Sequence, residues 1–175
     1  PSCTNFIYDF QKQGVFFGVT PEKLFTLNNQ DIKTVALAGT IETSNSNFDI
    51  NNSKELKEHN YVIDYIQNIL SKFSNQLLID KKPHIITLNK ISHLKTKIKA
   101  KINPHIDAFD ILYKIHPTPA VAGYPKNSSL NIISDLETHE RGWYGGPLGW
   151  IDTNYDADFV VCIRSGIITG NNLYI

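Results

Sequence analysis

Three segments in the last third of the chain combine backbone turns with polar side chains that can hold an anion. They read His116-Pro-Thr-Pro-Ala-Val-Ala-Gly-Tyr-Pro-Lys126, Glu140-Arg-Gly-Trp-Tyr-Gly-Gly-Pro-Leu-Gly-Trp150 and Phe159-Val-Val-Cys-Ile-Arg-Ser165. Turns rich in Pro and Gly let the backbone approach a ligand closely. Arg164 ends a run of apolar, strand-forming residues, where burial costs free energy unless the guanidinium meets an anion. The segments therefore predict a site for an anionic ligand.

Acidic side chains on one amphipathic segment form a second candidate site. Residues Lys54–Phe73 have a helical period, and Glu58 extends by one turn the apolar stripe of Val62, Ile66, Ile69 and Phe73. A carboxylate on a buried stripe requires a cation or a proton. Glu55 lies one turn earlier, close to the same face; alternatively, both carboxylates only stabilise the positive N-terminal end of the helix. We expect the neighbouring His59 at the surface.

The elements that position these residues alternate between strands and helices. A short strand is expected over 15–22, ending in a Pro turn, and a hairpin over Lys23–Asn28 and 32–37. The polar segment 43–53 predicts a loop, whose Asn52 and Ser53 cap the helix Lys54–Phe73.

Strands and short helices are expected in the rest of the chain. Residues 83–102 alternate as a strand with a solvated face of Lys95, Lys97, Lys99 and Lys101. Short helices are expected over Ala108–Ile115 and 128–136, and strands over 142–151, 158–168 and 173–175. The mixture predicts an α+β fold with mainly antiparallel pairing in one unit.

Composition excludes several functional classes. The formal net charge is zero, so nothing indicates a nucleic acid or a membrane surface as partner. No apolar run approaches the roughly 18 residues that span a bilayer, and no signal-peptide pattern opens the chain. Cys3 and Cys162 lie far apart, and Cys162 in its apolar strand is predicted to be a buried thiol. We therefore expect a cytoplasmic protein without disulfides.

Taken together, the ordered motifs resemble the chorismate-utilising enzymes: isochorismate synthase, anthranilate synthase component I, aminodeoxychorismate synthase component I and salicylate synthase. The resemblance covers the chain from Val15 onward. It implies a chorismate-binding fold, in which two mainly antiparallel sheets flanked by helices enclose one active site. It also implies chorismate as substrate and Mg²⁺ as cofactor.

The resemblance assigns two residues to the chemistry and two to the metal. Gly18-Val-Thr-Pro-Glu-Lys-Leu24 is similar to the family's Gly-x-x-Pro-Glu-x-Leu pattern, so Glu22 would be the general acid that protonates the departing C4 hydroxyl; otherwise it is a surface carboxylate in a turn. Such an acid needs a raised pKa near neutral pH, which partial burial provides. Ile91-Ser-His-Leu94 resembles the active-site His-Leu and implies a catalytic His93. Glu58, with Glu55 beside it, matches the helix that supplies a magnesium ligand.

Five further residues are implied to bind substrate, and one of them is Ala120 in the Pro-Thr-Pro-Ala pattern. Gly39 and Thr40 end Ala36-Leu-Ala-Gly-Thr40, which resembles the family's substrate-contacting Gly-Thr pair. Tyr144 and Arg164 resemble the Tyr and Arg that hold the substrate's carboxylates, and an Arg fork is a strong clamp for such a group. Tyr144 can alternatively be a core aromatic.

Two alanines select a branch of the family. Aminodeoxychorismate synthases carry a nucleophilic Lys where this chain has Ala38, so no amine is present to attack the ring. Anthranilate and salicylate synthases usually carry Thr at the position of Ala120, whereas isochorismate synthases tend to have Ala. The resemblance therefore favours isochorismate synthase, a monomer that needs no glutaminase partner, whose product would feed menaquinone, siderophore or salicylate production. The alternatives are an anthranilate synthase component I and a catalytically inactive, chorismate- or anion-binding domain.

The ends of the chain predict an incomplete member of the family. Met is absent, and residues 171–175 read as an unfinished strand. We expect one chorismate-binding domain over 1–175, truncated at both ends. The family's water-activating Lys precedes the Pro-Glu motif, and no residue before Phe16 matches it. Its Gly-Ala-Gly turn and second magnesium Glu would follow Ile175. The 175-residue chain alone is therefore expected to be inactive.

Overall fold

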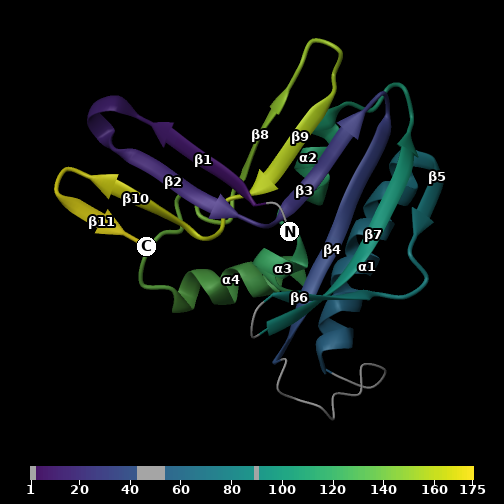
Figure 1. Cartoon of the computed structure of the whole chain (residues 1–175), viewed down its shortest axis with the longest axis horizontal. Helices are drawn as coiled ribbons and strands as arrows, with labels where there is room; N and C mark the ends of the chain where they lie inside the picture. Colours follow the sequence, from purple (N-terminus) through teal and green to yellow (C-terminus); the bar gives the residue numbers. More distant parts are fainter. Residues whose placement is uncertain (1–2, 43–53, 89–90) are drawn as a thin grey trace.

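Two antiparallel sheets organise the chain, and helices pack against the larger of them (Figure 1). The computed structural model describes residues 3–42, 54–88 and 91–175. The expected loop over 43–53, with its capping residues Asn52 and Ser53, lies outside them. In the described part of the chain, no helix combines the length and the apolar character needed to cross a membrane.

The small sheet brings together the two ends of the chain. Its strand order is β1 (Thr4–Asp9), β2 (Val15–Thr20), β10 (Ser165–Thr169) and β11 (Asn172–Tyr174), and the short 3₁₀ turn η1 (Gln11–Gln13) joins β1 to β2. Phe6, Phe16 and Cys162 form a compact apolar cluster on it. Burial raises the pKa of the Cys162 thiol to about 11, so the prediction of a buried thiol is confirmed.

The large sheet carries most of the core. Its order is β5 (Ser74–Ile79), β7 (Ile91–Ile102), β4 (Asp31–Glu42), β3 (Lys23–Asn28), β9 (Ala157–Val161) and β8 (Pro147–Ile151), and β6 (His84–Leu88) pairs with one end of β7. Even-numbered residues of β7 are buried while Lys97, Lys99 and Lys101 are exposed, as the alternation predicts. Lys95 departs from this pattern because it is only half-exposed and lines a cavity.

Helix α1 (Lys54–Phe73) covers the buried face of the large sheet, and its predicted range is confirmed. Its buried residues are His59, Val62, Ile66 and Leu70. The stripe therefore differs from the predicted one: Glu58 lies beside it and is exposed, whereas His59 is fully buried rather than at the surface. Val62, Ile66 and Leu70 pack with Ile98, Ile102 and Phe25 of the sheet in the main core.

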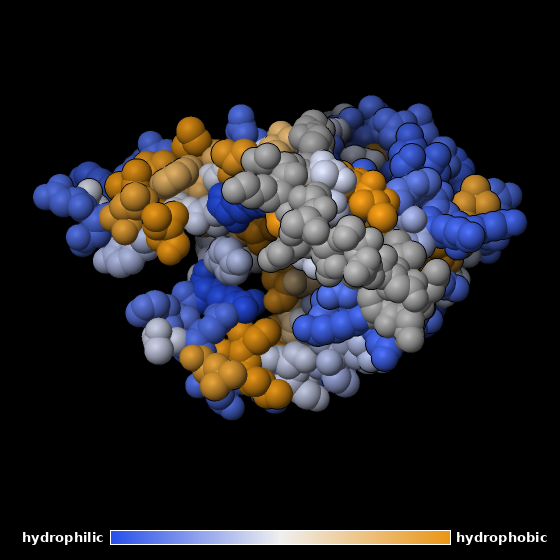
Figure 2. Space-filling view, turned by 60° about the horizontal axis from the view of Figure 1, so that its bottom comes forward, coloured by the Kyte–Doolittle hydropathy of each residue, from blue (hydrophilic) through white to orange (hydrophobic). Residues whose placement is uncertain are grey.

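The remaining helices follow β7. Helix α2 (Ala108–Ile115) begins with Asp107 and Asp110 in a capping box, and Ile111 and Ile115 join the core. Helix α3 (Pro119–Ala122) was not predicted, and α4 (Lys126–Leu136) begins two residues earlier than expected. Figure 2 shows a hollow between the lobe of the small sheet and the region of α4, with hydrophobic residues on both sides of it.

Three expected strands are divided or shortened in the structure, and two strands were missed. The segment 83–102 is the hairpin β6–β7, and residues 142–146 form turns before β8. The segment 158–168 divides into β9 in the large sheet and β10 in the small one. Strands β1 and β5 were not predicted. The α+β class with two antiparallel sheets is confirmed.

The chain crosses between the two sheets at two neighbouring places. One crossing joins β2 to β3 through Pro21 and Glu22, and the other joins β9 to β10 through 162–164. Hydrogen bonds tie the crossings together: Val161 N–H donates to the Glu22 carbonyl at 3.0 Å, and Val19 N–H donates to the Arg164 carbonyl at 3.1 Å. The link that contains Glu22 and the link that contains Arg164 are distant in sequence, and these hydrogen bonds bring them together at one junction.

Candidate active site

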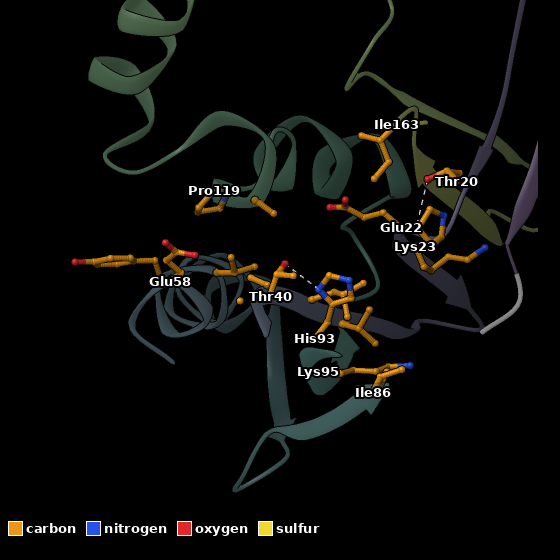
Figure 3. Close-up of a pocket in the computed structure, with 18 of the residues that line it drawn as sticks. Thr20, Glu22, Lys23, Thr40, Glu58, Ile86, His93, Lys95, Pro119 and Ile163 are labelled. Atoms are coloured by element: carbon orange, nitrogen blue, oxygen red, sulfur yellow. Dashed lines mark hydrogen bonds between the residues drawn. The ribbon is translucent and has the colours of Figure 1, made fainter. Parts of the chain in front are cut away.

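A cavity of about 900 Å³ lies beside the junction of the sheets (Figure 3). Both crossings, β4, α1, β7 and α3 contribute to its wall. Seven of the nine predicted site residues line it, namely Glu22, Gly39, Thr40, Glu58, His93, Ala120 and Arg164. The remaining two, Tyr144 and Glu55, lie outside the lining.

Glu22 is an acid that can hold a proton at neutral pH. Its backbone is held on both sides, because Glu22 N–H donates to Thr20 Oγ1 at 3.1 Å and the Glu22 carbonyl accepts from Val161 N–H at 3.0 Å. Burial raises the pKa of the Glu22 carboxyl to about 7, since a carboxylate loses hydration on entering the protein. Figure 3 shows the carboxyl pointing into the cavity. The side chain is therefore suited to general acid catalysis.

Thr40 and His93 form a polar pair on the cavity wall. Thr40 Oγ1 lies 3.1 Å from His93 Nδ1, as the dashed line in Figure 3 marks. The pairing of β4 with β7 slips by one residue between Ala38 and Thr40, because Gly39 is the extra residue of a bulge. The bulge turns the Thr40 side chain toward His93. Gly39 adopts a φ of +76°, a backbone conformation that favours glycine at this position.

Glu58 supplies the cavity with a carboxylate. It projects from the first turns of α1 and forms an ion pair with Lys54 at 3.3 Å. In the ranges 3–42, 54–88 and 91–175, no group of three or more His, Cys, Asp or Glu side chains is arranged to hold a metal. Mg²⁺ binds through one or two carboxylates together with water and substrate oxygens. Glu58 alone therefore fits as one ligand of such an ion and does not form a complete metal site.

Arg164 and Ala120 approach the cavity from different elements. Arg164 is exposed, not buried as its apolar neighbours suggested, and has a φ of +52° in the link between β9 and β10. This uncommon backbone conformation turns the chain from one sheet to the other and places the guanidinium at the cavity. Ala120 lies in the first turn of α3 and contributes only a methyl group.

The two predicted residues outside the lining have other contacts. Tyr144 is 47% exposed, and the Arg141 guanidinium lies 5.9 Å from its ring centre. Tyr144 is therefore not a core aromatic. Glu55 instead touches Gly39 through its backbone: a Cβ added to Gly39 would lie 2.7 Å from the Glu55 carbonyl oxygen.

Sequence reasoning missed several residues of the site. Lys95 lines the cavity beside His93, although the alternation assigned it to the solvated face. Tyr61 and Tyr124 also line it, and their rings stack with centres 4.8 Å apart. The alternation of β7 places Lys95 on the same face as His93, so this signal was present in the sequence. No local sequence pattern indicates that Tyr61 of α1 stacks against Tyr124.

An acid, a guanidinium, a Thr–His pair and a carboxylate surround one cavity, and groups of these kinds can bind an anion and transfer a proton. The profile of the family described as "Chorismate binding enzyme" matches residues 1–175. The chain belongs to this family of chorismate-binding enzymes.

Named relatives and solved structures refine the likeness. The chain is 37% identical over 185 residues to isochorismate synthase MenF of Haemophilus influenzae, covering 98% of this chain and 41% of that protein. The structure of MenF, the menaquinone-specific isochorismate synthase of Escherichia coli, superimposes with a TM-score of 0.84 at 29% identity, over 98% of this chain and 41% of that one. Anthranilate synthase component I of Streptococcus pneumoniae also has a TM-score of 0.84, at 25% identity, over 98% and 40%. The chain thus spans less than half the length of these relatives.

Proposed function

We propose that this chain forms the substrate-binding part of an isochorismate synthase, which converts chorismate to isochorismate. The observation that carries the proposal is Glu22, an acid with a pKa of about 7 on the wall of the cavity that Arg164 also lines. Chorismate is a dicarboxylate whose hydroxyl must be protonated to leave, so it needs both a cation and a proton donor. The named isochorismate synthases among the relatives support this choice.

The reaction requires one proton to be delivered and one to be lost. Glu22 donates its proton to the C4 hydroxyl as the C4–O bond breaks, and the ring double bond shifts as water forms a bond to C2. The attacking water gives its proton to a general base, which the family's pattern places on a Lys before the Pro-Glu motif, so product and substrate have the same composition. Thr40 and His93 provide a hydroxyl and an imidazole beside the ring, with Gly39 giving the backbone room for close approach.

The remaining predicted residues are proposed to bind the two carboxylates of the substrate and the metal ion. Arg164 binds one substrate carboxylate as a planar fork, and Tyr144 adds a hydroxyl to this clamp if its turn moves toward the cavity. Glu58 contributes a ligand for Mg²⁺, and Glu55 at the same end of α1 adds negative charge. When bound, Mg²⁺ supplies positive charge opposite the other carboxylate of the substrate. The protein is proposed to be a cytoplasmic monomer that needs no glutaminase subunit.

The methyl side chains of Ala120 and Ala38 separate this function from those of the anthranilate, salicylate and aminodeoxychorismate synthases. Anthranilate synthase component I is the second candidate, because the Streptococcus pneumoniae structure superimposes as well as MenF does. Ala120 presents no hydroxyl to the cavity, and Ala38 presents no amine. Hydroxyl exchange is therefore favoured over attack by ammonia and over elimination of pyruvate.

Product analysis tests the proposal. The gene product that contains this chain is incubated with chorismate and Mg²⁺, with and without ammonia, and the products are separated by chromatography. Isochorismate is the expected product, and Glu22→Gln should abolish its formation while calorimetry still detects chorismate binding. Anthranilate, or salicylate with pyruvate, would overturn the assignment to isochorismate synthase. Binding without any product would favour a catalytically inactive domain.

A further inference from the structure

His59 is a fully buried histidine directly behind the cavity wall. It follows Glu58 on α1, and its Nε2 atom lies 2.7 Å from the hydroxyl oxygen of Thr96 in β7, which is also fully buried. Its Nδ1 atom has no hydrogen-bond partner of ordinary geometry among the residues described. A buried imidazole with an unsatisfied nitrogen costs free energy that an apolar side chain would avoid. Packing alone therefore does not account for a histidine here.

The Ala38 carbonyl is the other polar neighbour of this ring. The carbonyl lies close enough to act on the ring, although no hydrogen bond of ordinary geometry joins it to Nδ1. A neutral imidazole with its proton on Nδ1 can accept from the Thr96 hydroxyl and turn its N–H toward the Ala38 carbonyl. His59 thus stands between β7 and the first residue of the bulge in β4.

The bulge itself determines which groups face the cavity. Gly39 is the extra residue of the bulge, and Thr40 resumes pairing with His93. The first turn of α1 contacts the bulge a second time, where Gly39 lies so close to the Glu55 carbonyl that a Cβ would not fit. A shift of the bulge relative to α1 would therefore change the distance between the Thr40–His93 pair and Glu58.

We propose that His59 is a positioning residue, which holds the Ala38–Thr40 bulge against α1 and β7 and so sets the Thr40–His93 pair relative to Glu58. The inference rests on the proposed function, because the groups that His59 positions are those proposed to meet chorismate. His59 itself does not line the cavity. Its contribution is geometric: it keeps two walls of the site, one from the helix and one from the sheet, in a single arrangement.

Three variants of the gene product that contains this chain separate positioning from packing. His59→Leu keeps an apolar side chain of similar size and removes both polar contacts. His59→Gln keeps one donor and one acceptor. Ile66→Ala is the matched control, because Ile66 is 1% exposed on the same face of α1 and does not line the cavity.

Two measurements are made on each variant: steady-state kinetics with chorismate, and amide hydrogen exchange of the peptide spanning 36–42 without ligand. In His59→Leu, we expect KM to rise about tenfold, with a smaller change in kcat, and exchange over 36–42 to accelerate about tenfold. Ile66→Ala should lower the denaturant midpoint without either change. His59→Gln should restore KM and exchange to within about threefold of the original protein.

The inference is overturned if His59→Leu and Ile66→Ala have the same effects on KM and on exchange over 36–42. If His59→Leu does not fold, Thr96→Val replaces it, because that variant removes only the hydroxyl that holds the ring; unchanged exchange over 36–42 in Thr96→Val then counts against the inference. Failure of the original protein to turn over chorismate would refute the proposed function, while the exchange data would still decide the role of His59.

Discussion

Val161 N–H donates a hydrogen bond to the Glu22 carbonyl at 3.0 Å, and the Val161 carbonyl accepts one from Thr20 Oγ1 at 2.6 Å. One residue at the end of β9 therefore holds both sides of the turn that carries the acid. Arg164 follows three residues later, in the link to the small sheet. Because these contacts are buried or partly buried, the junction fixes the backbone of Glu22 relative to the backbone of Arg164.

The raised pKa of Glu22 makes stability depend on pH. The carboxyl has a pKa of about 7 in the folded chain and 4.5 as its ordinary value, so above pH 4.5 the unfolded chain releases a proton that the folded chain retains. The contribution of the protonated Glu22 carboxyl to stability is fully present below pH 4.5 and is lost as the pH rises through 7. In Glu22→Gln this dependence disappears. We expect the free energy of unfolding of Glu22→Gln, minus that of the original protein, to rise by up to about 3 kcal/mol between about pH 4 and about pH 8. Urea unfolding at each pH measures this difference. A difference that stays constant with pH would contradict the raised pKa of Glu22.

The same pKa predicts the pH dependence of catalysis. A general acid acts only while it is protonated, so kcat for isochorismate formation should fall as the pH rises through about 7. The measurement is a pH–rate profile of the gene product that contains this chain, at saturating chorismate and Mg²⁺. A rate that continues to rise well above neutral pH would exclude Glu22 as the proton donor.

Thr20→Val should weaken the junction. The variant keeps the shape of the side chain but removes its bonds to the Val161 carbonyl and to Glu22 N–H, leaving both buried groups unsatisfied. We expect a loss of about 1–3 kcal/mol in the free energy of unfolding. Thr26→Val in the neighbouring strand is the control, because the described structure shows no side-chain hydrogen bond for Thr26. Equal losses for the two variants in urea unfolding would show that the hydrogen bonds of the Thr20 hydroxyl do not stabilise the junction.

Gly39→Ala should damage the bulge. Its φ of +76° strains any L residue, and the new Cβ would lie 2.7 Å from the Glu55 carbonyl oxygen in the helix backbone. Gly142→Ala is the matched control, since Gly142 also has a positive φ, +53°, but has open space around it. We expect about 1 kcal/mol of destabilisation for Gly142→Ala and at least about twice that for Gly39→Ala. Thermal unfolding compares them, and similar losses would mean that α1 yields readily at this contact.

Glu58→Gln should weaken Mg²⁺ binding without affecting the fold. Glu58 lines the cavity and is exposed, whereas Glu55 lies outside the lining. Calorimetric titration of Mg²⁺ in the presence of chorismate should show on the order of tenfold weaker binding for Glu58→Gln. Glu55→Gln should have a smaller effect. A larger effect of Glu55→Gln would show that Glu55, one turn nearer the start of α1, is the metal ligand instead of Glu58.

Local sequence patterns determined the elements with strong internal signals. The helix Lys54–Phe73 was predicted with both bounds correct, because an acidic first turn and a helical apolar period identify it without reference to the rest of the chain. The hairpin of β3 and β4 and the alternation of β7 were predicted for the same reason. Motif resemblance added seven residues that line one cavity, although no local pattern brings Glu22 near Arg164.

Tertiary structure decided which apolar segments divide and which polar residues are buried. The segment 158–168 has a continuous strand pattern, yet its two halves pair with different sheets, because β3 and β2 provide separate edges and Arg164 turns between them. His59 was expected in water and is instead buried against Thr96. Pairing partners and burial depend on surfaces contributed by distant segments, and these surfaces exist only after the chain has folded.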